Sequence, residues 1–215
     1  AARHPDQAFQ SPVGTGEPVV NDANPGFGPY ASAREAEGPF QKDQTYATLM
    51  LSLKGKKAPE DAKVDTDDIK EDIGKLGQLD HTDVPWAWYQ EGFGDGKGNK
   101  HPAYIPHHNS PQYFGYIRQN PAMWSGVHDL LDFFEVIDNK QLPTQSVVFL
   151  KGGKENPFGW KPADPRAMNI LGDDDHPGYS DAQLSESLVA KVVNAVARSP
   201  YWNDSAIIVL WDDSE

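Results

Sequence analysis

The apolar run at residues 206–211 (Ala-Ile-Ile-Val-Leu-Trp) constrains the fold more than any other segment of this sequence. A continuous run of this length, preceded by a short polar turn, is typical of a strand buried on both faces of a parallel sheet. Asp212 and Asp213 follow where that strand would leave the core, and ligands of open α/β sheets bind just outside the carboxyl ends of the strands. The run therefore predicts a buried strand with an acidic pair at the mouth of a site. A chain that ends there is expected to be a fragment of a longer enzyme.

The residues before this run alternate between helix and strand patterns. Apolar side chains at helical spacing predict two helices, one with the stripe Val127, Leu130, Leu131, Phe134 and Ile137, the other with the stripe Leu184, Leu188, Val192, Ala195 and Val196. A short buried strand is predicted between them, at 146–150. Ser180 and Gln183 match the capping-box pattern at the start of the second helix, and Arg198 and Pro200 mark its end.

The first half of the sequence is less regular, because much of the Gly and Pro lies there. Residues 1–44 are expected to form an extended Gly/Pro-rich segment, and residues 45–215 to belong to one domain. Within that domain the patterns predict a strand at 46–53, a helix at 65–79, a strand at 84–89 and a Gly-rich loop at 91–99. Pro85 restricts the 84–89 strand to a strand start or to the edge of a sheet.

This order of elements predicts an α/β fold with three layers, α/β/α, and a mostly parallel sheet. Strand exits and helix entrances lie at the same edge of a parallel sheet. The loops after Tyr89 and Leu150 and the Asp212–Asp213 pair should therefore face one side of the molecule, where ligands of such sheets bind.

Composition narrows the classes of function. The formal net charge of −13 argues against a nucleic-acid or anionic-membrane surface, since both need clustered Lys and Arg. The absence of Cys excludes thiol catalysis, thiolate metal sites and disulfides. No apolar run approaches the ~20 residues that span a bilayer, and the first five residues lack the apolar region of a signal peptide.

Two histidine-containing clusters lie on the predicted edge of the sheet. Imidazolium groups bind phosphate oxygens and act as acids near neutral pH, which suits the adjacent His107 and His108, although a surface loop with two histidines explains them equally well. For Asp173–Asp175, an acidic turn ahead of a helix is the favoured interpretation. His176 lies between this acidic run and Pro-Gly, a rigid setting suited to orienting its ring.

The third cluster is the pair Asp212 and Asp213. Carboxylate oxygens are the ligands that hard cations need. Neighbouring strand residues point to opposite faces, so both can bind one ion only where the strand has begun to turn; two solvated acids are the alternative. Lys151, Glu155 and Asn156 are weaker candidates on the connection after the 146–150 strand.

Familiar catalytic motifs are absent: the sequence contains no Gly-rich nucleotide fingerprint, Walker motif, His-Glu-x-x-His or Gly-x-Ser-x-Gly. The simplest remaining chemistry is metal-assisted hydrolysis of an anionic ester, with histidines binding its oxygens. A carboxylate-pair glycosidase fits less well, because adjacent carboxylates cannot straddle a sugar at the ~5–9 Å separation such enzymes need.

Four stretches, in this order, resemble the acid phosphatase and phospholipase C group of phosphoesterases in the alkaline phosphatase superfamily. They are residues 84–89, similar to a Trp-Ala-Trp-Tyr strand; 107–114, similar to a His-His-Gln-Pro-Phe-x-Tyr-Phe element; 176–179, similar to a His-x-Gly-Tyr turn; and 199–209, which lead into the aspartate pair. Ser110 and Pro111 stand where the family usually has Pro-Phe. The resemblance implies an alkaline-phosphatase-like domain and a periplasmic or secreted bacterial location.

The resemblance also implies roles for individual residues. Asp212 and Asp213 would bind one divalent metal ion of unspecified identity. His107, His108 and His176 would bind phosphoryl oxygens, with His108 or His176 protonating the leaving group. In this family a Ser or Thr nucleophile lies upstream of all four stretches. It is expected outside this chain, so the chain alone should not turn over substrate.

The expected function is metal-dependent hydrolysis of a phosphate ester, either a small monoester or a phospholipid head group. No nucleic-acid partner and no membrane span are expected, and the oligomeric state is left open. The alternative is a non-catalytic phosphoesterase homologue that acts as a cation-binding or interaction module.

Overall fold

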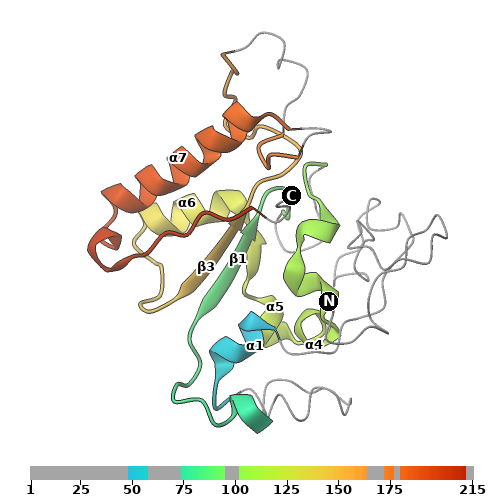
Figure 1. The fold of residues 1–215 in the computed structure, drawn as a ribbon, viewed down its shortest axis with the longest axis vertical. Helices are drawn as coiled ribbons and strands as arrows, with labels where there is room; N and C mark the ends of the chain where they lie inside the picture. Colours follow the sequence, from blue (N-terminus) through green and yellow to red (C-terminus); the bar gives the residue numbers. More distant parts are fainter. Residues whose placement is uncertain (1–47, 58–73, 95–101, 164–171, 177–179, 212–215) are drawn as a thin grey trace, which may run out of the picture.

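The centre of the molecule is a parallel sheet of three strands in the order β2-β1-β3, seen in a computed structural model that describes residues 48–57, 74–94, 102–163, 172–176 and 180–211 (Figure 1). The strands are β1 (Trp86–Gln90), β2 (Val127–Asp129) and β3 (Val147–Lys151). Tyr89 pairs with His128 of β2 on one side and with Leu150 of β3 on the other. The predicted α/β class with a parallel sheet is therefore confirmed. Pro85 lies just before the central strand, at a strand start.

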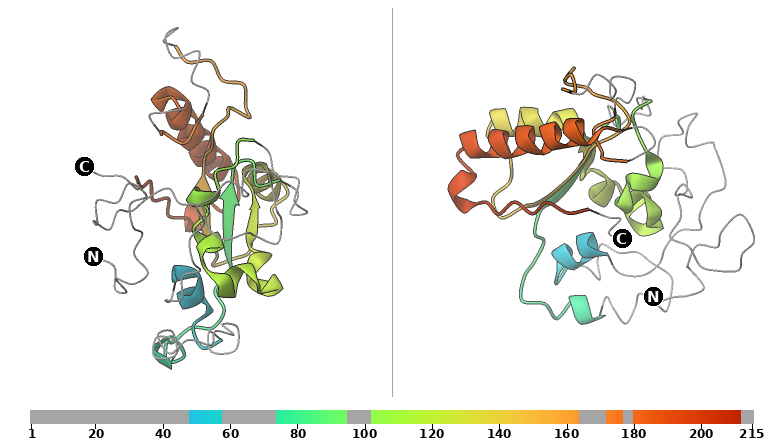
Figure 2. Two further views of the ribbon diagram at one scale, coloured as in Figure 1. Left: turned by 90° about the vertical axis from the view of Figure 1, so that its right-hand side faces the viewer. Right: turned by 45° about the horizontal axis from the view of Figure 1, so that its top comes forward.

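Side chains of the sheet alternate between two apolar clusters, as the period of two along a strand requires. Trp88 and Phe149 stack on one face with ring centroids 5.4 Å apart. Tyr89 and Leu150 belong to the cluster on the opposite face. Helices contribute to both clusters, so the sheet is the middle of three layers (Figure 2).

Two helices, α6 (Leu130–Asp138) and α7 (Ala182–Arg198), lie side by side over one face of the sheet (Figures 1 and 2). The buried residues of α7 are Leu184, Leu188, Val192 and Val196, which are the core of the predicted stripe. α7 ends at Arg198 as predicted. Because both helices run back from the carboxyl edge of the sheet, their last turns lie at its amino edge.

The predicted start of the first helix was wrong. Residues 127–129 form β2, and α6 begins at Leu130 with Asp129 as its N-cap and Asp132 completing a capping box. Three residues are too few to reveal a period of two, and the helical spacing happens to continue through them. Phe133 is buried in place of Leu131, which is 46% exposed.

The predicted Ser180–Gln183 capping box was also wrong. The N-cap of α7 is Asp181, whose side chain accepts the backbone N–H of Gln183 at 2.9 Å. The Gln183 side chain instead accepts the backbone N–H of Ala163 at 2.8 Å, across the neighbouring loop. Asp and Ser are equally good N-cap residues, so the sequence pattern does not distinguish Asp181 from Ser180, and tertiary contacts determine which of them caps α7.

The other face of the sheet is covered by short helices: α1 (Leu49–Lys54), α4 (Gly115–Arg118) and α5 (Pro121–Trp124). A strand at 46–53 was predicted, and the described part of it is helical. Thr48 caps α1 by accepting the backbone N–H of Leu51 at 3.1 Å. Met50 and Leu51 are buried. Leu and Met are not branched at Cβ and lose little rotamer freedom in a helix, which favours α1 over a strand.

The predicted buried strand at 206–211 is not formed. These residues follow the 3-10 turn η5 (Trp202–Asp204), have no regular structure, and pair with none of the three described strands. Ile208 and Leu210 are 77% and 82% exposed. An apolar run becomes a buried strand only if a neighbouring strand pairs with its backbone and both faces are covered; here neither condition is met.

Several predicted segments are described only in part. Residues 74–76 are helical, while the rest of the predicted 65–79 helix up to residue 73 lies outside the described residues. Residues 1–44 and most of the 91–99 loop lie outside them as well. Within the described ranges, none of the helices combines the length and the apolar character that crossing a bilayer requires.

Candidate functional site

Two of the three predicted polar clusters, the histidine loop and the 172–176 segment, lie at the carboxyl edge of the sheet. Glu91 directly follows β1, and Gly152 and Gly153 directly follow β3, which is parallel to β1. The 172–176 segment attaches there, because the backbone N–H of Asp173 donates to the carbonyl of Gly153 at 3.0 Å. Gly172 also forms a parallel bridge with Ser180, just ahead of α7. The loops after β1 and β3 therefore share one edge, as predicted.

The histidine loop is anchored to this edge through Gln90, the last residue of β1. Gln90 is fully buried, accepts the indole N–H of Trp88 at 3.1 Å and donates to the carbonyl of Ile105 at 2.7 Å. Ile105 directly precedes the 3-10 turn η2 (Pro106–His108), which carries both histidines. A buried amide that uses both of its ends fixes the loop relative to the strand.

A second polar network holds the loop from inside. The Tyr104 hydroxyl donates to Oε1 of Gln112 at 2.6 Å and accepts from Nδ2 of Asn109 at 2.9 Å. Oδ1 of Asn109 accepts the backbone N–H of Gln112 at 3.2 Å, at the start of the 3-10 turn η3 (Ser110–Tyr113). Asn109 and Gln112 are both completely buried. Sequence reasoning missed this scaffold, whose only signal was three amide or phenol side chains close together in an otherwise apolar and Pro-rich stretch.

The two histidines of η2 lie against each other and differ in their surroundings. Their rings meet edge to face, with centroids 4.6 Å apart. Nδ1 of His108 lies 3.3 Å from Oδ2 of Asp174, within ion-pair range but without the geometry of a hydrogen bond. The Asp174 side chain is fully buried, and that of His108 is 11% exposed. A carboxylate at one ring nitrogen orients an imidazole and leaves the other nitrogen to face a ligand.

Asp174 also organises the third histidine. Its Oδ1 accepts the backbone N–H of His176 at 3.2 Å, while the carbonyl of His176 accepts the Ser180 hydroxyl at 2.6 Å. One carboxylate thus contacts the ring of His108 and the backbone of His176. The favoured interpretation of Asp173–Asp175 was an acidic turn ahead of a helix. Asp175 is exposed with φ +66°, whereas Asp173 and the Asp174 side chain are buried.

Beneath these segments, Glu91 and Asp173 form a buried pair of acids, 3% and 1% exposed. One oxygen of each accepts a backbone N–H, from Glu155 to Glu91 at 3.1 Å and from Gly153 to Asp173 at 3.0 Å. Burial, followed by contact with Asp173, raises the pKa of Glu91 to about 10. Burial also raises the pKa of Asp173. Sequence reasoning had given neither acid a role of this kind.

The weaker candidates after β3 have structural roles in part. Asn156 closes its own loop, accepting the backbone N–H of Trp160 at 2.9 Å and donating to the carbonyl of Trp160 at 2.5 Å. Glu155 contributes its backbone N–H to Glu91. Lys151 is the last residue of β3. None of these contacts assigns them to a ligand.

The predicted metal ligands Asp212 and Asp213 lie outside the described residues. Among the residues that are described, no group of three or more His, Cys, Asp or Glu side chains is arranged to hold a metal ion. A metal on the aspartate pair stays a prediction.

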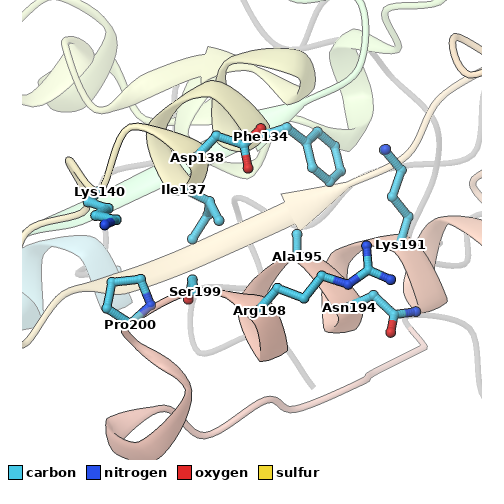
Figure 3. Close-up of a pocket in the computed structure, with 10 residues that line it drawn as sticks. All are labelled: Phe134, Ile137, Asp138, Lys140, Lys191, Asn194, Ala195, Arg198, Ser199 and Pro200. Carbon is cyan, nitrogen blue, oxygen red and sulfur yellow. The ribbon is translucent and has the colours of Figure 1, made fainter.

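A surface pocket of about 440 Å³ lies between α6 and α7, away from this edge. Figure 3 shows Lys140, Lys191 and Arg198 around it, with Ile137 of α6 and Ala195 of α7 on its walls. It is formed by the last turns of both helices and therefore lies at the amino edge of the sheet. None of its lining residues belongs to the histidine clusters.

The family model described as "Phosphoesterase family" matches residues 26–215. No curated protein matches the chain. The match spans the histidine loop, the 172–176 segment and the aspartate pair, all of which the sequence had assigned to the site.

Proposed function

This chain belongs to the phosphoesterase family, the group of acid phosphatase and phospholipase C type, and we propose that its carboxyl sheet edge binds the phosphoryl group of a phosphate ester for metal-dependent hydrolysis. Phosphate ester hydrolysis is what the family suggests. The observation that carries the proposal is Asp174, one buried carboxylate that contacts both the ring of His108 and the backbone of His176.

In this proposal the histidines bind and protonate. With Asp174 at Nδ1, His108 directs Nε2 toward an oxygen of the phosphoryl group, and His107 and His176 bind further oxygens. Protonated imidazoles neutralise the charge that develops on these oxygens. His108 or His176 then donates a proton to the leaving oxygen as the bond from phosphorus to that oxygen breaks. The attacking hydroxyl is that of a Ser or Thr expected outside this chain.

The family is typically metal-dependent, and we propose that Asp212 and Asp213 hold one divalent ion. When bound, the ion supplies Lewis-acid stabilisation of phosphoryl oxygens. The remaining functions belong to the residues described above: orientation of the imidazoles, exclusion of water beneath them and delivery of the proton. The proposed substrates are small monoesters or phospholipid head groups, and the proposed location is the periplasm or outside the cell.

The test is hydrolysis by the protein expressed from its complete reading frame, at acid and neutral pH, with and without chelator. The substrates are p-nitrophenyl phosphate and p-nitrophenyl phosphorylcholine. Chelator-sensitive turnover of the monoester alone identifies a phosphatase, and turnover of the choline diester identifies a phospholipase C. Absence of turnover on both would leave the non-catalytic homologue as the better description.

Binding by the 215-residue chain gives a second, independent readout. Inorganic phosphate is titrated while the imidazole ¹⁵N resonances are followed, in the wild type and in His108→Gln. We expect His107, His108 and His176 resonances to move together and the response to weaken in the variant. His81 packs elsewhere, with Nε2 2.8 Å from the carbonyl of Ser52, so its resonance should stay fixed and reports nonspecific binding if it moves.

A further inference from the structure

The contact between Glu91 and Asp173 needs a proton to be stable. Both side chains lie against Gly153, which donates its backbone N–H to Oδ1 of Asp173 at 3.0 Å and packs closely on Cδ of Glu91. Oε2 of Glu91 and Oδ2 of Asp173 are buried and have no hydrogen-bond donor as long as both acids are ionised. Two anions in contact away from water repel each other and lose their hydration. One proton removes the repulsion and supplies the missing donor.

The backbone around the pair is shaped for this close contact. A Cβ atom on Gly152 would lie 2.6 Å from Oδ1 of Asp173, and one on Gly153 would lie 3.0 Å from Cδ of Glu91. Both positions therefore need glycine. Gly153 also donates its N–H to Asp173 and accepts the N–H of Asp173 through its carbonyl. The loop after β3 thus surrounds both acids.

We propose that Glu91 and Asp173 share one proton at neutral pH, and that this shared proton fastens the 172–176 segment to the end of β1 and so positions Asp174 against His108. Glu91 and Asp173 are positioning residues in this proposal and do not touch substrate. The consequence for catalysis rests on the proposed function; the shared proton does not.

The proton belongs to the folded state. Glu91 releases its proton near pH 4.5 when unfolded, whereas its pKa in the folded chain is about 10. Between these values the folded chain holds one proton more than the unfolded chain. Stability supplied by the pair is fully present below about pH 4.5 and falls as the pH rises toward 10. The charged groups that act on the pair are acidic, Glu155 on Glu91 and Asp174 on Asp173, and Asp174 in turn faces His108.

The first experiment measures unfolding of the 215-residue chain by denaturant between pH 6 and pH 9, for the wild type and Glu91→Gln. Gln is neutral at every pH and donates an N–H to Asp173 in place of the shared proton. The unfolding equilibrium constant of the wild type, relative to that of the variant, should rise about tenfold per pH unit. Glu186→Gln, at an exposed position of α7, is the matched control and should run parallel to the wild type.

Parallel pH curves for the wild type and Glu91→Gln would overturn the proposal, because the pair would then hold no extra proton. A divalent cation between the two acids would also overturn it. In that case Ca²⁺ would raise, and chelator would lower, the stability of the wild type but not of Glu91→Gln. We expect Ca²⁺ and chelator to affect the wild type and Glu91→Gln equally.

The second measurement tests positioning through the imidazole ¹⁵N signals of His108, which report its tautomer. We expect a single tautomer in the wild type and in Glu91→Gln. We expect a mixture in Glu91→Ala, which leaves Oδ2 of Asp173 without a donor. An unchanged His108 signal in a folded Glu91→Ala variant would refute the positioning role. If Glu91→Ala does not fold, the His108 signal of Glu91→Gln tests the positioning role instead. A mixture of tautomers in that variant would refute the positioning role.

Neither measurement requires turnover, so the outcomes separate. A pH-dependent difference in stability without a phosphate response would refute the proposed function and support the shared proton. A phosphate response without the pH slope would do the reverse.

Discussion

Asp174 and His108 meet through Oδ2 and Nδ1 at 3.3 Å, with the carboxylate fully buried. The two residues are 66 positions apart, from 108 to 174. The contact joins the 107–114 stretch of the family resemblance to the acidic run just ahead of the 176–179 stretch. A buried carboxylate this close to an imidazole fixes which ring nitrogen faces outward.

Asp174→Asn should lower hydrolysis by the complete protein about 10–100-fold, the range typical of a carboxylate that orients a functional histidine. Asn keeps the size of the side chain but removes the charge at Nδ1. The measurement is kcat/KM for p-nitrophenyl phosphate. Asp175→Asn, at the exposed neighbour, is the control and should change little. Equal rates for both variants would contradict the role of Asp174.

Asn109→Ala should cost about 1–3 kcal/mol of unfolding free energy, because it removes the two hydrogen bonds that the buried Asn109 side chain makes, one to the Tyr104 hydroxyl and one to the Gln112 N–H. Denaturant unfolding of the 215-residue chain measures this. Asn194→Ala removes an exposed side chain that bonds only within α7, to the carbonyl of Ala190, and should stay within about 0.5 kcal/mol. If Asn109→Ala is equally mild, the scaffold beneath the histidines is not what holds them.

Gly152→Ala should be destabilising by about 1–3 kcal/mol, the usual cost of overpacking. Its Cβ would meet Oδ1 of Asp173 at 2.6 Å and the Asp173 carbonyl oxygen at 2.7 Å, and a backbone oxygen cannot move aside cheaply. Gly74→Ala is the opposite case, with nothing within 4 Å of the added Cβ in a helical segment. It should be neutral or stabilise by up to about 1 kcal/mol. Thermal unfolding of both variants compares them directly.

Ile208→Ser should change stability by less than about 0.5 kcal/mol, because this side chain is 77% exposed. Leu130→Ala, at a position with no exposure, should cost about 2–5 kcal/mol. Denaturant unfolding measures both. If Ile208→Ser lowered the free energy of unfolding nearly as much as Leu130→Ala, residues 206–211 would be buried, as the sequence predicted.

Asp213→Ala should remove the bound metal and the activity of the complete protein together, because carboxylates are the proposed ligands. Metal content by atomic absorption and hydrolysis of p-nitrophenyl phosphate are measured on the same preparation. Asp204→Ala, in η5 close by in the sequence, is the control and should retain both. An active, metal-loaded Asp213→Ala protein would refute the assignment.

The elements that could be predicted were those with a strong local signal. α7 has four buried residues at helical spacing, and Arg198 followed by Pro200 ends it unambiguously. β1 and β3 are compact apolar runs, and β1 also carries the Trp-Ala-Trp-Tyr pattern of the family. The three-residue strand β2 carried no pattern of its own, and helical spacing through Val127 concealed it.

Short-range pattern failed wherever a neighbour decided the outcome. Leu49–Lys54 is apolar enough for a strand, but the Thr48 cap and the packing of Met50 and Leu51 make it a helix. The run at 206–211 is apolar enough for a buried strand, but no described strand pairs with it. Both errors have the same cause. An apolar run indicates that burial is favourable, but it does not indicate which neighbouring segment buries it.

The sequence by itself determined the α/β class and the family, with a match over residues 26–215, and it predicted that the loops after β1 and β3 share one edge of a parallel sheet. Only the tertiary structure decided how the histidines are held. Asp174 beneath His108, the buried Gln90, Asn109 and Gln112, and the Glu91–Asp173 pair are contacts between segments far apart in the chain. Such contacts form because polar groups that are buried together on folding must satisfy one another's hydrogen bonds and charges. A local sequence pattern does not show which groups are buried together.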